Sequence, residues 1–363
     1  MAILVAKLGS STLVDADGRL RDEVLEARVQ DLLRARRMGH RPVLVSSGAI
    51  ACGLARLGFA ARPTALPDLQ AASAVGQGVL FQHYQKAFAP HGAIPAQVLL
   101  TTADLERRDS YLNARNTLGR LLDLGTVPIV NENDTTATDE LTFGDNDVLA
   151  ARVAILLNAA WLILLTDREG LYAEGPEGPE LIGDVPPGTR PTDLRLAAIG
   201  GSGHGRGGIA SKVASASMAT GGGVTCVIAS GTADGVIAAI ASGNHVGTRF
   251  SPGPRRESAF KLWLRYAKPT MGRVRVDAGA VQALVGKGTS LLPVGVTSCE
   301  GAFAAGDAVE VTDADGVRAV GKGITAMSAE EIRAVAGLQS AAVRERLPEA
   351  AAEVIHRDQF VLL

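Results

Sequence analysis

The sequence predicts an α/β protein in which helices enclose a mainly parallel sheet, followed by a small domain rich in β-strands. Up to about residue 250, short apolar runs alternate with longer stretches of helical periodicity, which is typical of parallel sheets with crossover helices. The segment 251–258 (SPGPRRES) then concentrates proline, glycine and charge, as exposed domain boundaries do. The length of 363 residues also favours two domains, because a domain usually contains ~100 to 200 residues.

Short apolar runs are expected to form the sheet of the first domain, and each is too short to favour a helix. They are Ile3–Ala6, Pro42–Val45, Ile94–Leu99, Val127–Val130, Trp161–Leu165 and Val224–Ala229. Between the first two runs, residues 21–38 place leucine and valine at spacings of three and four, which predicts an amphipathic helix that covers one face of the sheet. A second long helix is expected over 71–88.

The second domain is expected to be a small β-barrel. Three β-type runs (272–276, 308–311 and 317–320) are separated by Asp and Gly turns, and Asp315-Gly316 is a strong hairpin signal. Ser328–Glu331 has the pattern of a capping box that opens a short helix. The expected organisation is a first domain over 1–255, a linker over 256–271, the small domain over 272–350 and a tail over 351–363.

Composition and charge argue against several classes of protein. Apolar residues make up 47% and charged residues 20%, as in globular proteins, and the net charge of −2 gives no general reason to expect a nucleic acid or an anionic membrane as main partner. The three cysteines match neither a disulfide framework nor a zinc spacing, and the six histidines include no i, i+4 pair. The apolar run before Lys7 is too short for a signal peptide or a spanning helix, so we expect a cytoplasmic protein.

Two turns of small residues follow neighbouring predicted strands. After the first strand come Lys7, Gly9 and Ser10, where backbone N–H groups can approach a phosphate and the lysine supplies positive charge. After the second strand, Ser46–Ile50 opens a helix at the carboxyl end of a parallel strand, where open α/β sheets bind ligands. The alternatives are an ordinary turn in the first case and a helix N-cap in the second. Together the two turns indicate a shared ligand crevice.

Three further segments carry candidate binding residues. Asn131–Asp134 and Gly144–Asp147 crowd carboxylates and amides, which suits recognition of an amine and a carboxylate, or of Mg²⁺, although a solvated loop is the alternative. Asp167 follows a strand and could orient a lysine or hold a metal-bound water, or simply form an Asx-turn. Gly200–Gly208 precede a helix that contains Lys212, which predicts a phosphate-facing loop, with a mobile linker as the alternative.

Taken in order, these motifs resemble the glutamate 5-kinase family. The matching stretches are AKLGSS, VSSGAI, SAVGQ, LNARNT, VNENDT, FGDND, LLTDREGLY and GRGGIASK, and they span the first domain. The C-terminal stretches VDAGA, GTSLLPVGV, GDAVEV and VGKGI are similar to a PUA domain. The resemblance therefore implies an amino acid kinase fold followed by a PUA-like barrel.

The resemblance also implies an activity. The expected reaction is ATP-dependent phosphorylation of the γ-carboxylate of L-glutamate, which gives L-glutamyl 5-phosphate and ADP in the first step of proline biosynthesis. Mg²⁺ is expected to travel with ATP, and proline is expected to inhibit by feedback. The implied partners are a second or further copies of the chain, as a homodimer or homotetramer, and a glutamyl phosphate reductase. Neither a membrane nor RNA is expected as a partner.

Carried over residue by residue, the resemblance assigns the site. Lys7 and Lys212 would contact the ATP phosphates as catalytic residues, and Asp167 would orient them. The other ATP-binding residues would be Gly9, Ser10, Thr166, Arg206, Gly207, Gly208, Ile209, Ala210 and Ser211. Glutamate would be held by Ser47, Gly48, Ala49, Asn131, Asp134 and Asn146, with Asp145 and Asp147 supporting that loop. No protein ligand is assigned to the metal. Arg206–Ile209 departs from the TGGM-like sequence common in the family, so the roles in that loop are less fixed.

Two alternatives remain at this point. The chain could be another member of the amino acid kinase fold that acts on aspartate, N-acetylglutamate or a small phosphorylated substrate, but the two Asn- and Asp-rich clusters and the PUA-like domain count against this. It could also bind RNA through the PUA-like domain. Residues 270–350 contain 8 Lys and Arg against 10 Asp and Glu, so they lack the basic footprint that phosphate contacts require.

Overall fold

The computed structural model consists of two compact units. It describes residues 1–15, 18–59, 61–136, 146–189, 193–197, 208–253, 259–266, 268–348 and 351–363. The first unit is Met1–Arg256 and the second is Glu257–Leu363. Each unit has its own sheet and its own buried apolar cluster, so each is described by itself.

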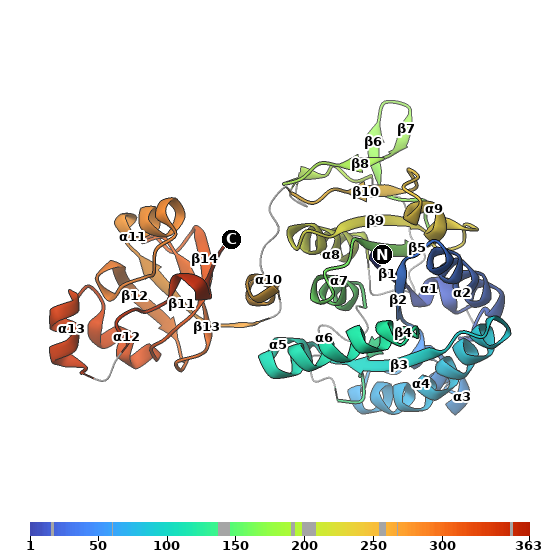
Figure 1. Ribbon diagram of the computed structural model, residues 1–363, viewed down its shortest axis with the longest axis horizontal. Coiled ribbons are helices and arrows are strands. Elements are labelled where there is room, and N and C mark those ends of the chain that lie inside the picture. Colours follow the sequence, from blue (N-terminus) through green and yellow to red (C-terminus); the bar gives the residue numbers. More distant parts are fainter. Residues whose placement is uncertain are drawn as a thin grey trace. The chain divides into compact units, whose positions relative to one another are not determined.

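The first unit is built on an eight-stranded sheet (Figure 1). In spatial order its strands are β3 (Pro95–Leu100), β4 (Val127–Glu132), β2 (Arg41–Ser46), β1 (Ile3–Leu8), β5 (Trp161–Thr166), β9 (Thr225–Ser230), β10 (Thr248–Phe250) and β8 (Asp184–Val185). Neighbours from β3 to β9 are parallel, whereas β10 is antiparallel to β9. All the predicted runs form strands, so the mainly parallel sheet is confirmed.

Helices cover both faces of this sheet. In Figure 1, α2 (Asp22–Arg37), α4 (Leu66–Phe88) and α9 (Val236–Ala241) lie on one face, and α6 (Arg108–Asp123), α7 (Asn146–Leu156) and α8 (Ile209–Gly221) lie on the other. Shorter elements complete the unit: α1 (Ser10–Leu13), α3 (Ala49–Leu57), the 3-10 turn Ala89–His91, α5 (Thr102–Glu106) and the hairpin of β6 (Tyr172–Gly175) and β7 (Gly178–Leu181). The expected three-layer α/β architecture is therefore present.

The core of the first unit lies between β1 and its flanking helices. Leu4 and Ala6 of β1 are fully buried, as are Val29 and Leu32 of α2. A central parallel strand is covered on both faces, which explains its nearly continuous apolar sequence. The helix predicted over 21–38 buries the apolar stripe that its spacing indicated. Burying a leucine or valine side chain in this way stabilises the fold by ~1.5–3 kcal/mol.

The second unit contains a five-stranded sheet in the order β12 (Val296–Gly301), β11 (Thr270–Val276), β13 (Ala308–Thr312), β14 (Ala319–Ile324) and β15 (Phe360–Leu362). Its helical elements are α10 (Ala259–Tyr266), α11 (Ala278–Gln282), the π-helical turn Ala283–Lys287, the 3-10 turns Pro293–Gly295 and Arg357–Gln359, α12 (Ala329–Val335) and α13 (Ser340–Arg346). Val274, Val309 and Ile332 belong to its core.

Local signals in the second unit predicted its turns well. β13 and β14 form an antiparallel hairpin, and Gly316 in its turn has φ of +73°, a conformation that favours glycine. β14 begins two residues later than expected because Val317 stands in the turn, 87% exposed. The Ser328 hydroxyl accepts a hydrogen bond from the Glu331 backbone N–H, and the Glu331 carboxylate accepts from Ser328, so the capping box is confirmed.

The ranges expected as a linker and a tail both contain regular structure. Residues 256–271 include α10, and residues 351–363 end in β15, which pairs with β14. β15 is only three residues long, so it gives no periodic signal in the sequence. Among the described residues, no helix has both the length and the apolar character needed to cross a membrane.

Candidate active site

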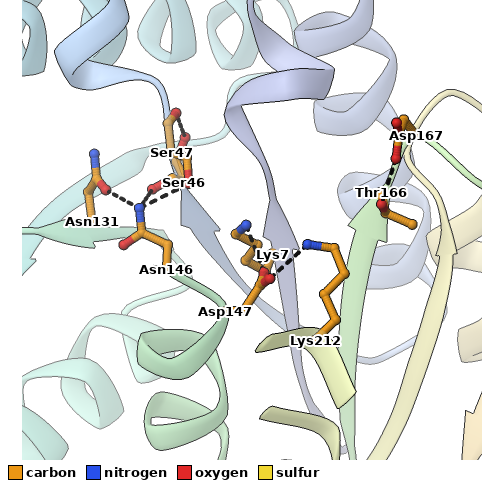
Figure 2. Close-up of polar contacts among 9 residues, drawn as sticks. All are labelled: Lys7, Ser46, Ser47, Asn131, Asn146, Asp147, Thr166, Asp167 and Lys212. Atoms are coloured by element: carbon orange, nitrogen blue, oxygen red, sulfur yellow. Dashed lines mark hydrogen bonds and ion pairs between the residues drawn. The ribbon is translucent and has the colours of Figure 1, made fainter. Parts of the chain in front are cut away.

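The site is assembled at the carboxyl edge of the parallel strands. β1, β2, β4 and β5 run in the same direction, so the residues at their ends meet along one edge. Lys7 lies opposite Val45 of β2 and Leu164 of β5. The backbone N–H of Ser47, just after β2, donates to the Leu8 carbonyl at 3.0 Å. Residues that are distant in the sequence thereby form one cluster (Figure 2).

Two lysines share one buried carboxylate. The Lys7 Nζ lies 2.7 Å from Asp147 Oδ1, and the Lys212 Nζ lies 2.7 Å from Asp147 Oδ2. Asp147 is fully buried, and the two lysines are 5% and 9% exposed. Burial alone would raise the pKa of Asp147, but the two ammonium groups outweigh it and hold that pKa below its ordinary value. The group therefore carries two positive charges and one negative charge.

Each member of this group is placed by a different element. Lys7 belongs to β1, Asp147 lies in the first turn of α7, and Lys212 lies in the first turn of α8, where its backbone N–H donates to the Gly208 carbonyl. Gly9 follows β1, and a Cβ atom there would stand 3.4 Å from the Lys7 Nζ. A residue without a side chain therefore keeps the space beside the ammonium group open.

A second cluster consists of amides and serines at the ends of β2 and β4. The Asn146 Nδ2 group lies within hydrogen-bond distance of three acceptors: the Ser46 carbonyl at 3.1 Å, the Ser47 hydroxyl at 3.0 Å and the Asn131 Oδ1 at 3.1 Å. These four residues are buried. Gly48, with φ of +108°, makes the left-handed turn that leads from β2 into α3. Ala49 is the first residue of that helix.

Two oxygen atoms at this cluster are buried without a hydrogen-bond partner among the described residues. They are Asp134 Oδ1 and Asn146 Oδ1. The other Asp134 oxygen accepts a hydrogen bond from the Ser73 hydroxyl at 2.7 Å. Burial raises the pKa of Asp134 above its ordinary value, against the opposing effects of that hydrogen bond and of the Arg62 charge. Two buried acceptors without donors suit a ligand that brings N–H groups.

Thr166 and Asp167 lie at the end of β5, apart from the lysine pair in Figure 2. The Thr166 hydroxyl donates to the Asp167 carboxylate at 3.0 Å. The sequence predicted that Asp167 orients the two lysines. In the structure, Asp147 is a carboxylate that contacts both of them. For Asp147 the sequence predicted only that it supports the loop that binds glutamate. A direct role of Asp167 in nucleotide binding stays a prediction.

The glycine-rich loop is described only in part. Gly208 and the first residues of α8 (Ile209, Ala210 and Ser211) lead to Lys212, whereas Arg206 and Gly207 lie outside the described residues. Asp145 also lies outside them, while its neighbours Asn146 and Asp147 are described. Ser10, in α1, directly follows Gly9.

The described residues offer no preformed cage of protein ligands for a divalent metal. They include no group of three or more His, Cys, Asp or Glu side chains that could hold a metal ion. Both oxygens of Asp147 are already paired with lysines. A divalent metal held mainly by phosphate oxygens and water would need few of these residues.

Ser73 and Gln77 are contacts that the sequence did not assign. Both belong to α4 and are buried; Ser73 contacts Asp134 just after β4, and Gln77 contacts the last two residues of β4. Their signal is a pair of polar residues four positions apart that face the same way on a helix. That pattern alone does not distinguish a buried pair from an exposed one.

Comparisons with known proteins agree with this architecture. The sequence model of the amino acid kinase family matches residues 2–230, more than half of the chain, and that of the PUA domain matches residues 272–347. A protein named glutamate 5-kinase from Ralstonia pickettii is 46% identical over 364 aligned residues, which cover 99% of this chain and 97% of that protein. A protein of the same name from Myxococcus xanthus is 47% identical over 310 residues, which cover 85% of this chain and 82% of that protein. Another, from Synechococcus sp. strain JA-2-3B'a(2-13), is also 47% identical over 310 residues, which cover 84% of this chain and 83% of that protein. With its three-layer kinase fold, its C-terminal PUA domain and this similarity, the chain belongs to the glutamate 5-kinase family.

Proposed function

We propose that the protein catalyses the ATP-dependent phosphorylation of the L-glutamate γ-carboxylate, forming L-glutamyl 5-phosphate and ADP. The observation that carries the proposal is the buried group of Lys7, Asp147 and Lys212 beside the amide cluster at one edge of the sheet. The first supplies net positive charge for phosphates, and the second supplies acceptors for an amino acid. Membership of the family supports glutamate as the acceptor.

The chemistry needs little from the protein beyond charge and position. A glutamate γ-carboxylate has a pKa of ~4.3, so it is already an ionised nucleophile at neutral pH and requires no general base. The remaining tasks are to hold two anions in line and to stabilise the transferring phosphoryl group. In this proposal Lys7 and Lys212 contact the ATP phosphates, and Asp147 holds both ammonium groups at the place where charge develops.

Mg²⁺ is proposed to arrive with ATP, bound chiefly through the phosphates. It would supply further positive charge to the phosphoryl oxygens. Thr166 and Asp167, with Gly9, Ser10 and residues 206–211, are proposed to lie along the nucleotide. No described group of side chains suggests a separate metal site.

The glutamate pocket is proposed to lie at the amide cluster. Asp134 Oδ1 and Asn146 Oδ1 are the acceptors without donors among the described residues, so they suit the α-ammonium group. Asn131 supports Asn146, and the turn of Ser47, Gly48 and Ala49 offers backbone groups for a carboxylate. Asp145 is proposed to support the same loop.

Several wider proposals rest on the family alone. They are the place of the reaction as the first step of proline biosynthesis, feedback inhibition by proline, assembly as a homodimer or homotetramer, transfer of product to a glutamyl phosphate reductase, and a cytoplasmic location. Inhibition is tested by titrating proline at several glutamate concentrations. Proline that competes with glutamate would support a shared pocket, and activity unaffected by proline would contradict the inhibition.

The reaction itself is tested by trapping the acyl phosphate. The purified protein is incubated with ATP, Mg²⁺, hydroxylamine and L-glutamate, with aspartate and N-acetylglutamate in parallel. Hydroxamate that depends on glutamate would support both the reaction and the substrate. Preference for another acceptor would contradict the glutamate assignment and leave the phosphate site in place.

A further inference from the structure

Helix α4 buries two polar residues, Ser73 and Gln77, against the end of β4. They are 0% and 8% exposed and lie four positions apart, so they project from the same face of the helix. A buried polar side chain is destabilising unless its hydrogen bonds are satisfied. Both side chains satisfy theirs on residues of the proposed glutamate pocket.

Gln77 connects to the pocket through a chain of amides. Its Nε2 donates to the Glu132 carbonyl at 3.1 Å, and its Oε1 accepts from the Asn131 Nδ2 at 3.2 Å. The Glu132 backbone N–H in turn donates to the Asn131 Oδ1 at 2.9 Å. A backbone carbonyl can only accept and a backbone N–H can only donate, so the main chain of Glu132 fixes the orientation of both amides.

The orientation of Asn131 determines which atom of Asn146 remains for a ligand. Asn131 Oδ1 accepts from the Asn146 Nδ2, and the Ser46 carbonyl accepts from the same group. The N–H groups of Asn146 are therefore used within the protein. Its Oδ1 is left buried without a donor among the described residues. The chain of amides thus presents an acceptor, rather than a donor, to the pocket.

Ser73 has the equivalent effect on Asp134. Its hydroxyl donates to Asp134 Oδ2 at 2.7 Å, which fixes the carboxylate and leaves Oδ1 buried without a partner in the described part of the chain. One face of α4 thus supports both of the unpaired acceptors. Neither Ser73 nor Gln77 is itself among the groups proposed to contact the substrate.

The position of α4 is fixed by its close contact with α3. A Cβ atom at Gly76 would lie 1.8 Å from the Ala49 carbonyl oxygen, and one at Gly53 would lie 1.7 Å from the Ala72 carbonyl oxygen. The two helices therefore touch along their backbones. Ala49 is the first residue of α3, so the same contact fixes the turn after β2 relative to Gln77.

We propose that Ser73 and Gln77 are positioning residues that direct the unpaired oxygens of Asp134 and Asn146 toward the ammonium group of the amino acid substrate. This proposal rests on the proposed function. It predicts that losing either side chain weakens the binding of glutamate while the lysine pair, and with it the use of ATP, is left intact.

The test compares Gln77→Met with Gln82→Met, the same change at an exposed position of the same helix. Gln77→Met leaves the buried Glu132 carbonyl without its donor, which is strongly unfavourable. The substitution is therefore expected to raise the KM for glutamate about 10-fold and to leave the KM for ATP within about twofold of the wild-type value. Gln82→Met is expected to change neither value. Ser73→Ala is expected to raise the KM for glutamate about fivefold.

The outcomes separate this proposal from simpler ones. If Gln77→Met lowers the thermal midpoint but leaves the KM for glutamate unchanged, Gln77 is only a core residue and its proposed role is overturned. An equal rise in the KM for glutamate and the KM for ATP would overturn that role as well. If Gln77→Met does not fold, Gln77→Glu keeps the acceptor for Asn131 and loses the donor to Glu132, so it must also raise the KM for glutamate. If the wild-type protein forms no glutamyl hydroxamate, the proposed function itself is overturned.

Discussion

At the scale of single residues, the lysine pair is the feature on which turnover is expected to depend most. Lys7→Ala and Lys212→Ala are each expected to reduce kcat ~100-fold or more, because each removes a positive charge that stabilises the transferring phosphoryl group. Lys86→Ala, at an exposed position of α4, is the matched control and is expected to retain full activity. Hydroxamate formation at saturating substrates measures all three. Near-normal turnover in either site variant would contradict the assignment.

The same assay distinguishes the roles of Asp147 and Asp167. Asp147→Asn removes the carboxylate that contacts both lysines and is expected to reduce kcat ~100-fold or more. Asp167→Asn is expected mainly to raise the KM for ATP, since Asp167 lies beside Thr166 at the end of β5. Circular dichroism checks that each variant is folded. A greater loss of kcat at Asp167 than at Asp147 would instead support the orienting role that the sequence predicted for Asp167.

Asp134 is expected to favour binding at the expense of stability. Burial raises the pKa of Asp134, so the folded state holds the proton of this carboxyl more tightly than the unfolded chain does. As the pH rises through the raised pKa, ionisation of Asp134 therefore lowers the free energy of unfolding. Asp134→Asn is therefore expected to have an equal or higher thermal midpoint at pH 7 without substrate, with a higher KM for glutamate. The difference in midpoint should shrink toward pH 4. A clearly lower midpoint at pH 7 would contradict this.

The sequence predicted the members of the site better than their contacts. Lys7 and Lys212 were identified because glycine and small residues beside a lysine are typical of phosphate turns. Asp147 was identified too, but its contact with both lysines depends on how α7 and α8 pack against β1, which no local pattern encodes. Ser73 and Gln77 were missed for the same reason, because their partners belong to another element.

At the scale of elements, strands were predictable where they form apolar runs of several residues. β1 and β5 are largely apolar runs of six residues each, whereas β8 and β10 contain two and three residues and pair only at the edge of the sheet. α7 gave no amphipathic pattern because nine of its eleven residues are buried. A helix that is apolar on all sides carries no stripe, so its period cannot reveal which face meets the sheet.

The contact between α3 and α4 gives a matched pair of glycine substitutions. Gly76→Ala would place a Cβ atom 1.8 Å from a backbone oxygen, so it is expected to destabilise the first unit by ~1–3 kcal/mol or more. Gly78→Ala, two residues along the same helix, meets nothing within 4 Å and is expected to stabilise by ~0.5–1 kcal/mol. Urea unfolding measures both. Equal effects of the two substitutions would contradict the close helix contact.

At the scale of the whole molecule, strand order explains why the site lies where it does. β1 is followed in the chain by β2, its neighbour on one side, and β5 pairs with β1 on the other. In open α/β sheets, ligands bind beyond the carboxyl ends of strands where the order reverses in this way. The lysine pair includes Lys7 of β1 beside this reversal, and the amide cluster lies next to it at the ends of β2 and β4, which suits a reaction between two separately bound substrates.

Every described site residue belongs to the first unit, Met1–Arg256, which has its own sheet and core. A chain that ends at Arg256 is therefore expected to fold and to form glutamyl hydroxamate with a kcat within about threefold of the full chain, because no described site residue comes from the PUA domain. The hydroxamate assay on both chains, with thermal unfolding as the control for folding, checks this. A folded first unit without activity would mean that the PUA domain contributes to the active state. Unchanged activity would leave proline sensitivity and assembly as the properties in which to look for its effect.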